Sequence, residues 1–144
     1  MKDTKNLLDY NVWSAGDYLT TMDGFSGGNE AIVQLSNEFS INGEYSIKTI
    51  RKSPLYGTTL FTRLSNLTGT NTINATVKVY SPNNHVKVNL YNGSILTEVT
   101  CPASSTVQNI SLTTTVTSSY VDLRFFLDNV DDFIFVDDIS IIVI

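Results

Sequence analysis

The sequence predicts an all-β protein that folds as an antiparallel sandwich of about eight to nine strands, on the basis of three observations. In several short segments, apolar residues occupy every second position, which is the spacing of a half-buried strand. Turn residues separate these segments, and none shows the 3.6-residue repeat of an amphipathic helix. Thr, Ser and Asn number 18, 15 and 14 of the 144 residues, a composition that favours strands joined by short turns. The length suits a single domain over residues 1–144.

The predicted strands follow one another along the whole chain. A short strand is expected within residues 5–11, and a long loop follows it as far as residue 29. The most regular segment is residues 73–80, where four apolar residues alternate with four other residues. Asn-Gly pairs at residues 42–43 and 92–93 predict tight hairpin turns. The other strands are expected at residues 31–35, 45–51, 58–64, 85–91, 107–112, 120–127 and 131–144.

Composition and charge narrow the classes of partner and compartment. The net charge is −5, and the nine basic residues are dispersed, so nucleic acid is an unsuitable partner and an extended anion would be repelled. No segment approaches the length of a membrane span, so we expect no membrane insertion. Residues 1–10 lack the apolar core of a signal peptide, so either the protein is not exported by that route or the chain is a module of a longer protein. We favour the second interpretation and expect an extracellular, cell-surface or virion location, because a chain rich in Thr, Asn and Ser is common in such proteins. Cys101 is the single cysteine, which excludes an internal disulfide.

Two adjacent carboxylates interrupt the last predicted strand. Asp137 and Asp138 lie in its middle, where consecutive side chains point to opposite faces of the sheet. One of the two is therefore expected to point toward the apolar side. A buried carboxylate is unfavourable unless it is paired, hydrogen-bonded or bound to a metal. The pair thus predicts a device that closes the fold or a site that binds a ligand.

Three segments, in their order along the chain, resemble the galactose-binding-like jelly-roll domains. Residues 6–8 (NLL) resemble the first strand of these domains, and residues 43–48 (GEYSIK) resemble their G-x-x-S-L-K strand. Residues 135–140 (FVDDIS) resemble the closing strand, in which an aromatic residue precedes two aspartates. The resemblance is strongest to the carbohydrate-binding modules of secreted glycoside hydrolases. It implies a jelly-roll sandwich that binds a neutral carbohydrate on a concave sheet or on edge loops without cleaving it.

The resemblance also implies a structural calcium ion, which many of these modules hold. Calcium takes six to eight oxygen ligands, usually including two or more carboxylates. The candidate ligands in this chain are Asp138, Asp137, Asp9 and Glu44. The modules carry an Asn-Gly-x-Phe-Glu-like segment after the first strand, whereas residues 9–13 read DYNVW here, so the usual acidic residue is missing or replaced by Asp9. The alternative is that one of the two adjacent aspartates caps backbone amides of the first strand and the other faces water.

The outward side chains of the central strands combine rings with charged and amide groups. They are Phe61, Arg63, Lys78, Tyr80, Lys87, Asn89, Tyr91, Asp122, Arg124 and Phe126. Sugar recognition uses flat aromatic surfaces for stacking and paired polar groups for hydroxyls, so we predict stacking by Tyr80, Tyr91 and Phe126. Hydroxyl binding is predicted for Arg124, Asp122, Lys87 and Asn89. The alternative is an ordinary exposed sheet face.

Other residues add one candidate and support a second class of function. Trp13 lies in the long first loop, where it either forms a further stacking platform or covers one end of the core. His85 is the single histidine and makes no recognisable catalytic arrangement with Cys101, so we expect no enzyme. The alternative function is a structural or adhesive domain of a virion or cell-surface protein. Such a domain would contact other domains of a longer chain or form a homo-oligomer.

Overall fold

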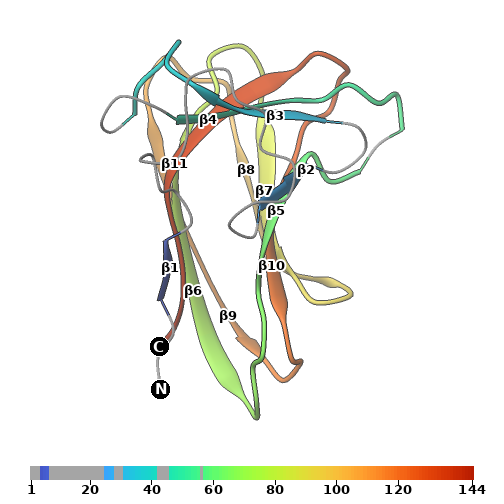
Figure 1. The fold of residues 1–144 in the computed structure, drawn as a ribbon, viewed down its shortest axis with the longest axis vertical. Helices are drawn as coiled ribbons and strands as arrows, with labels where there is room; N and C mark the ends of the chain where they lie inside the picture. Colours follow the sequence, from blue (N-terminus) through green and yellow to red (C-terminus); the bar gives the residue numbers. More distant parts are fainter. Residues whose placement is uncertain (1–3, 7–24, 28–30, 42–45, 56) are drawn as a thin grey trace.

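The computed structural model describes residues 4–6, 25–27, 31–41, 46–55 and 57–144, which form two antiparallel sheets packed face to face (Figure 1). The six-stranded sheet contains β1 (Thr4–Asn6), β3 (Ile32–Ser36), β4 (Ser46–Ile50), β6 (Asn71–Tyr80), β9 (Gln108–Val116) and β11 (Phe133–Val143). The five-stranded sheet contains β2 (Phe25–Gly27), β5 (Leu60–Leu64), β7 (Val86–Tyr91), β8 (Ile95–Cys101) and β10 (Val121–Phe126). Within the described part of the chain, no helix has the length and apolar character needed to cross a membrane.

Neighbouring strands come mostly from distant parts of the chain. The order is β3-β4-β11-β6-β9 in one sheet and β2-β5-β10-β7-β8 in the other, and every pairing is antiparallel. Strand β11 is long enough to pair with β4 through its first half and with β1 through its second half. Only β3–β4 and β7–β8 join consecutive strands, and the second of these is a hairpin that turns at Gly93 with φ of 108°. Non-local pairing of this kind is typical of a jelly roll.

The hydrophobic core lies between the two sheets and follows the predicted alternation. In β6 the buried residues are Ile73, Ala75, Val77 and Val79. Facing them, β7 and β10 bury Val88, Leu90, Leu123 and Phe125 completely. Burying one such large apolar side chain contributes about 1.5–3 kcal/mol. Because alternate residues must point away from the core, the same pattern fixes which side chains of β7 and β10 reach the outer face.

The structure contains more strands than the sequence predicts, with eleven among the described residues. Strand β2 has only three residues and lies in the predicted long loop. Strand β8 was not predicted because it is an edge strand, with Thr and Glu in its middle and little regular alternation of burial. The strand expected at residues 107–112 continues through a run of threonines to Val116.

A β-bulge resolves the conflict in the closing strand. Asp137 is opposite Lys78 and Ser140 is opposite Thr76, so β11 contains one extra residue between these pairs. Asp138 takes a φ of 49° there, and Val136 and Ile139 are both buried although they are three residues apart. The expectation that one aspartate points into the core is therefore wrong, because the bulge breaks the two-residue period. Asp137, although buried, lies on the same side of the sheet as Lys78.

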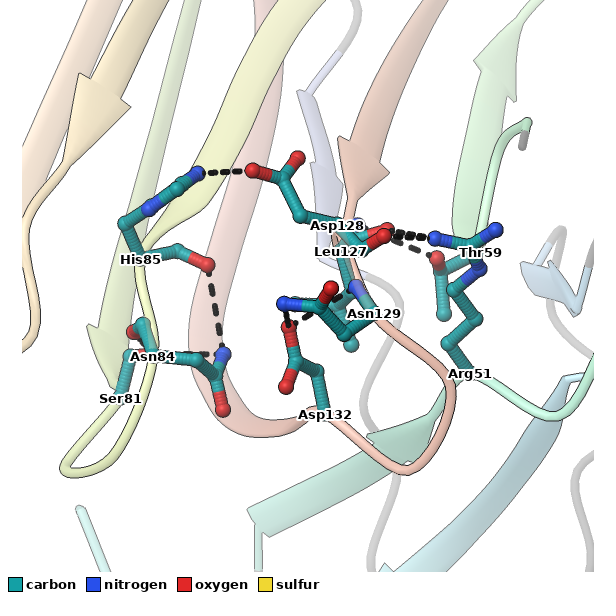
Figure 2. Close-up of polar contacts among 9 residues, drawn as sticks. All are labelled: Arg51, Thr59, Ser81, Asn84, His85, Leu127, Asp128, Asn129 and Asp132. Atoms are coloured by element: carbon teal, nitrogen blue, oxygen red, sulfur yellow. Dashed lines mark hydrogen bonds and ion pairs between the residues drawn. The ribbon is translucent and has the colours of Figure 1, made fainter. Parts of the chain in front are cut away.

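Buried Arg51 anchors the loop that joins β10 to β11, as Figure 2 shows. Its Nη1 donates to the carbonyl oxygens of Leu127, at 3.2 Å, and of Asp128. Its Nε and Nη2 donate to the carbonyl oxygens of Ser53, at 3.0 Å, and Pro54, at 3.1 Å. The guanidinium therefore satisfies carbonyl groups of two loops at once, which fixes the end of β10.

The same loop is also attached to the start of β7. The imidazole Nε2 of His85 contacts the carboxylate of Asp128, and the backbone N–H of Asn129 donates to Asp132 Oδ2 at 3.0 Å (Figure 2). His85 immediately precedes β7 and Asp128 follows β10, so their contact ties together two neighbouring strands just beyond their last paired residues. These two strands are the ones that carry the polar side chains described next.

Candidate functional site

Six of the predicted binding residues lie together on the outer face of the five-stranded sheet. The register of β7 and β10 places Asp122 opposite Tyr91, Arg124 opposite Asn89 and Phe126 opposite Lys87. All six alternate with core residues that are fully buried, so their side chains point away from the core. The prediction that they share one face is met by these six residues. Whether they bind a ligand stays a prediction.

Asp122 is the centre of a charged cluster on this face. Its side chain has no exposed surface, and it accepts two hydrogen bonds from Arg63, from Nε at 2.7 Å and from Nη2 at 3.0 Å. Nη2 of Arg124 lies 3.6 Å from its second oxygen. The hydrogen bond with Asp122 raises the pKa of Arg63 above its ordinary value. Arg63 therefore binds the carboxylate in the bidentate geometry that Arg favours, and the same carboxylate attracts the Arg124 guanidinium.

Each of these guanidinium groups also lies over an aromatic ring. The Arg124 guanidinium carbon is 3.7 Å from the centroid of Tyr91, and that of Arg63 is 4.1 Å from the centroid of Tyr120. Phe61 lies further from Arg124, at 5.9 Å. Such contacts restrain a guanidinium through attraction to the ring face. The result is a rigid surface on which flat groups alternate with hydrogen-bond donors.

A hollow of about 200 Å³ lies beside this cluster. It is lined by Lys87, Asn89, Ile95, Glu98 and Phe126. The lining therefore combines one ring and one aliphatic side chain with an ammonium, a carboxylate and an amide. This is the mixture of apolar and polar groups that small-molecule sites present.

Two buried polar atoms on this face have no hydrogen-bond partner in the part of the chain that the structure describes. Asn89 is fully buried, and its Nδ2 donates to Glu98 Oε2 at 3.0 Å, whereas its Oδ1 has no partner among the described residues. Nε of Arg124, in the residue directly opposite, likewise has none. A buried donor or acceptor without a partner is unfavourable by about 1–3 kcal/mol. An unsatisfied donor and an unsatisfied acceptor therefore belong to residues that lie opposite each other on adjacent strands, and one of these residues, Asn89, lines the hollow.

One predicted stacking residue, Tyr80, is not part of this face. Tyr80 ends β6 in the other sheet, where its ring stacks on Phe39 with centroids 3.7 Å apart and an angle of 12°. Its neighbour Phe135 is 6.1 Å away, so Tyr80 belongs to a separate aromatic cluster. The prediction grouped it with Tyr91 because sequence alternation does not assign strands to sheets. Trp13 lies outside the described residues.

Three residues of the face were missed by the sequence analysis. Ile95 and Glu98 come from β8, which was not predicted as a strand. The register of β8 on β7, with Glu98 opposite Asn89, is the feature that brings them to the site. Tyr120 immediately precedes β10 and was passed over because it lies at the end of a predicted strand.

The calcium ligands implied by the resemblance are described only in part. Asp9 and Glu44 lie outside the described residues. Asp137 Oδ1 accepts a hydrogen bond from the backbone N–H of Asp138 at 2.8 Å, and Asp138 Oδ2 is 3.1 Å from Nζ of Lys78. Within the described ranges, no three His, Cys, Asp or Glu side chains gather as metal ligands would. A calcium ion at the bulge would compete with the Lys78 ammonium for the carboxylate of Asp138. Because two of the four candidate ligands lie outside the described residues, the calcium site stays a prediction.

His85 and Cys101 are not among the residues that line the hollow, and Cys101 is opposite Val86, the residue that follows His85. Cys101 ends β8 with its side chain in the core, and burial raises the pKa of its thiol above the ordinary value. His85 contacts Asp128 at the start of β7. A neutral buried thiol is a poor nucleophile.

No protein-family model matches this sequence, and no curated protein matches it either. Solved structures do match it over most of its length. The xylan-binding CBM22-1 domain of Xyn10C from Paenibacillus barcinonensis has a TM-score of 0.63 at 12% identity, over 90% of this chain and 96% of that domain. The module TmCBM61, in complex with β-1,4-galactotriose, has a TM-score of 0.60 at 12% identity, over 94% of this chain and 97% of that one.

A phage protein has a comparable similarity. The enzymatically active domain of tailspike protein 4 from bacteriophage CBA120 has a TM-score of 0.62 at 8% identity, and the match covers 97% of this chain but only 22% of the phage chain. Likeness at these identities shows a shared fold. The chain has the jelly-roll β-sandwich fold of carbohydrate-binding modules, which confirms the predicted fold class and the resemblance on which it was based.

Proposed function

We propose that this chain is a non-catalytic module that binds a neutral carbohydrate on the outer face of its five-stranded sheet. The observation that supports this most directly is a pair of buried polar atoms without a partner among the described residues: Oδ1 of Asn89, a residue that lines the hollow, and Nε of Arg124, the residue opposite Asn89. A sugar hydroxyl donates one hydrogen bond and accepts others. One hydroxyl, or two on adjacent ring carbons, would therefore supply the donor that Asn89 lacks and the acceptor that Arg124 lacks.

The apolar part of a sugar would be held by Phe126. This half-buried ring lines the hollow together with Ile95, and a flat ring suits the C–H face of a pyranose. Tyr91 has a different part in the proposal, because the Arg124 guanidinium already covers one face of its ring at 3.7 Å. We assign stacking mainly to Phe126 and treat Tyr91 as the support that holds Arg124.

We propose binding without catalysis because the carboxylates on this face do not form the pair that a glycosidase needs. A glycosidase needs two carboxyl groups that flank the bond to be cleaved. Asp122 is fully buried and bound bidentately by Arg63, so it is unable to act as an acid or nucleophile. Glu98, the carboxylate that lines the hollow, is then without a partner for this chemistry.

Affinity electrophoresis with soluble glycans tests the proposal. Xylan and β-1,4-galactan are suitable first probes, because one of the similar structures is a xylan-binding domain and another is a module in complex with β-1,4-galactotriose. We expect one of these neutral glycans to retard the protein, and Phe126→Ala to weaken binding by about tenfold or more, which corresponds to at least about 1.4 kcal/mol.

Tyr80→Ala is the matched control, because it removes a half-buried ring from the opposite sheet. It should leave retardation unchanged while its fold is verified by circular dichroism. Absence of retardation by any neutral glycan, or equal retardation of the wild type and Phe126→Ala, would contradict the proposal.

A further inference from the structure

We infer that Glu98 sets the class of ligand by fixing the orientation of the Asn89 amide, so that the hollow accepts a hydroxyl group and rejects a carboxylate or sulfate at this position. This inference rests on the proposed function. It assigns Glu98 as a positioning residue, because Glu98 acts through the Asn89 side chain.

The contact between the two side chains leaves a single orientation of the amide. Asn89 and Glu98 are opposite each other on β7 and β8, and Asn89 Nδ2 is 3.0 Å from Glu98 Oε2. An ionised carboxylate accepts hydrogen bonds but donates none, so the amide must turn its NH₂ group toward Glu98. Its oxygen is then the atom that faces away from Glu98. Asn89 is fully buried, so water does not compensate for a reversed amide.

In this fixed orientation, the unsatisfied atom of Asn89 is a hydrogen-bond acceptor, its Oδ1. Asn89 Oδ1 has no partner among the described residues, and Asn89 lines the hollow together with Glu98. An anionic oxygen placed there would meet the amide oxygen and the carboxylate without any proton between them. A hydroxyl is able to donate to Asn89 Oδ1 and to accept from Arg124 Nε, whereas a carboxylate or sulfate oxygen is able only to accept.

The positive charges on this face would by themselves favour an acidic sugar over a neutral one. Lys87 lines the hollow and Arg124 lies on the adjacent strand, and these two cations would attract a uronic acid or a sulfated sugar. Selectivity for a neutral sugar thus depends on Glu98 and on the amide that it holds. Removing the charge of Glu98 should therefore change which ligand binds, as well as how tightly ligands bind.

The test is Glu98→Gln, which keeps the size of the side chain but lets it donate as well as accept. The Asn89 amide is then able to reverse and to offer its NH₂ group to the ligand. Binding is measured by calorimetry at pH 7 for two neutral probes, xylohexaose and β-1,4-galactotriose, and for two acidic probes, xylotriose substituted with glucuronic acid and trigalacturonate. We expect the wild type to prefer a neutral probe and the variant to reduce the ratio of neutral to acidic affinity by about tenfold.

Glu38→Gln is the control for net charge. It removes one negative charge from the segment that follows β3 of the other sheet, where Glu38 pairs with Lys48 of β4 at 2.8 Å, and the ratio should stay at the wild-type value. A second measurement does not depend on any glycan. The side-chain NH₂ resonances of Asn89 should shift between the unliganded wild type and Glu98→Gln, because the carboxylate partner has been lost.

The outcomes separate the inference from the proposed function. A wild type that binds a neutral probe, together with an unchanged ratio in Glu98→Gln or unchanged Asn89 resonances, overturns the inference and leaves the proposed function standing. A wild type that binds only acidic probes overturns the inference and the neutral ligand together. A wild type that binds none of the probes overturns both.

Discussion

Asp122 lies at the centre of the polar contacts on the outer face, although its own side chain has no exposed surface. Two hydrogen bonds from Arg63 and the nearby Arg124 guanidinium compensate its charge. A buried carboxylate that loses such partners is strongly unfavourable, and guanidinium groups that lose the carboxylate are no longer oriented. We therefore regard Asp122 as a residue that positions the two arginines, and place the ligand contacts on Arg124, Asn89 and Phe126.

Asp122→Asn tests this role at the level of stability. The substitution keeps the shape but removes the charge, and we expect the free energy of unfolding to fall by about 1–3 kcal/mol. Arg63 is 46% exposed, so solvent screening keeps the loss below that of a fully buried pair. The measurement is urea denaturation followed by tryptophan fluorescence.

Asp131→Asn is the matched control for that substitution. Asp131 pairs with Lys52 at 2.6 Å, but the two side chains are 69% and 43% exposed. Exposed pairs of this kind contribute about 0–1 kcal/mol. Equal losses of stability in the two variants would show that burial of Asp122 has no special importance.

Sequence alternation predicted which residues of β7 and β10 point outward, because their inward neighbours are consistently apolar. It did not reveal how those residues contact one another. Whether Asp122 would be solvated or bound by Arg63 depends on β5 lying next to β10, a pairing that brings together residues 59 positions apart in the sequence. Glu98 was beyond prediction for a related reason, since only the register of β8 makes it a partner of Asn89.

At the scale of elements, the bulge in β11 allows an acidic pair to interrupt a buried strand. The extra residue, Asp138, takes up the change of register at a φ of 49°, so the apolar residues before and after it both face the core. The carboxylate of Asp138 then reaches Lys78 on the outer side of the sheet. A left-handed backbone is tolerated by Asp better than by most residues.

The bulge predicts different effects for two substitutions at one position. Asp138→Gly and Asp138→Val both remove the contact with Lys78, but only glycine adopts a positive φ without strain. We expect the valine variant to be less stable than the glycine variant by about 1–3 kcal/mol in chemical denaturation. Equal stability of the two variants would contradict a left-handed Asp138.

The strands that were predicted well and those that were missed differ in their position within the sheets. Strands β6, β7 and β10 pair on both sides and face the core along their whole length, which produces a clear alternation. Strands β2 and β8 are at the edges of the five-stranded sheet, where burial constrains the sequence less. Strand β11 contains a bulge, and the two-residue period fails there because no local pattern marks an inserted residue.

At the scale of the whole molecule, the fold alone indicates less about function than the residues of the candidate site do. Jelly-roll sandwiches occur in the xylan-binding and galactotriose-bound modules and also as part of a phage tailspike domain. A shared fold does not transfer a ligand between them. What favours glycan binding here is local: two unsatisfied polar atoms, a ring and a hollow on one face.

The most direct test of the central claim is titration of the ¹⁵N-labelled protein with xylohexaose and with β-1,4-galactotriose, followed by mapping of amide and Asn side-chain resonances. We predict that one of these sugars shifts the resonances of Asn89 and its neighbours on β7, β8 and β10, and leaves the outer face of β6 and β9 unchanged. No shift with either sugar, or shifts centred on the six-stranded sheet, would contradict the claim that this chain binds a neutral glycan on the five-stranded sheet.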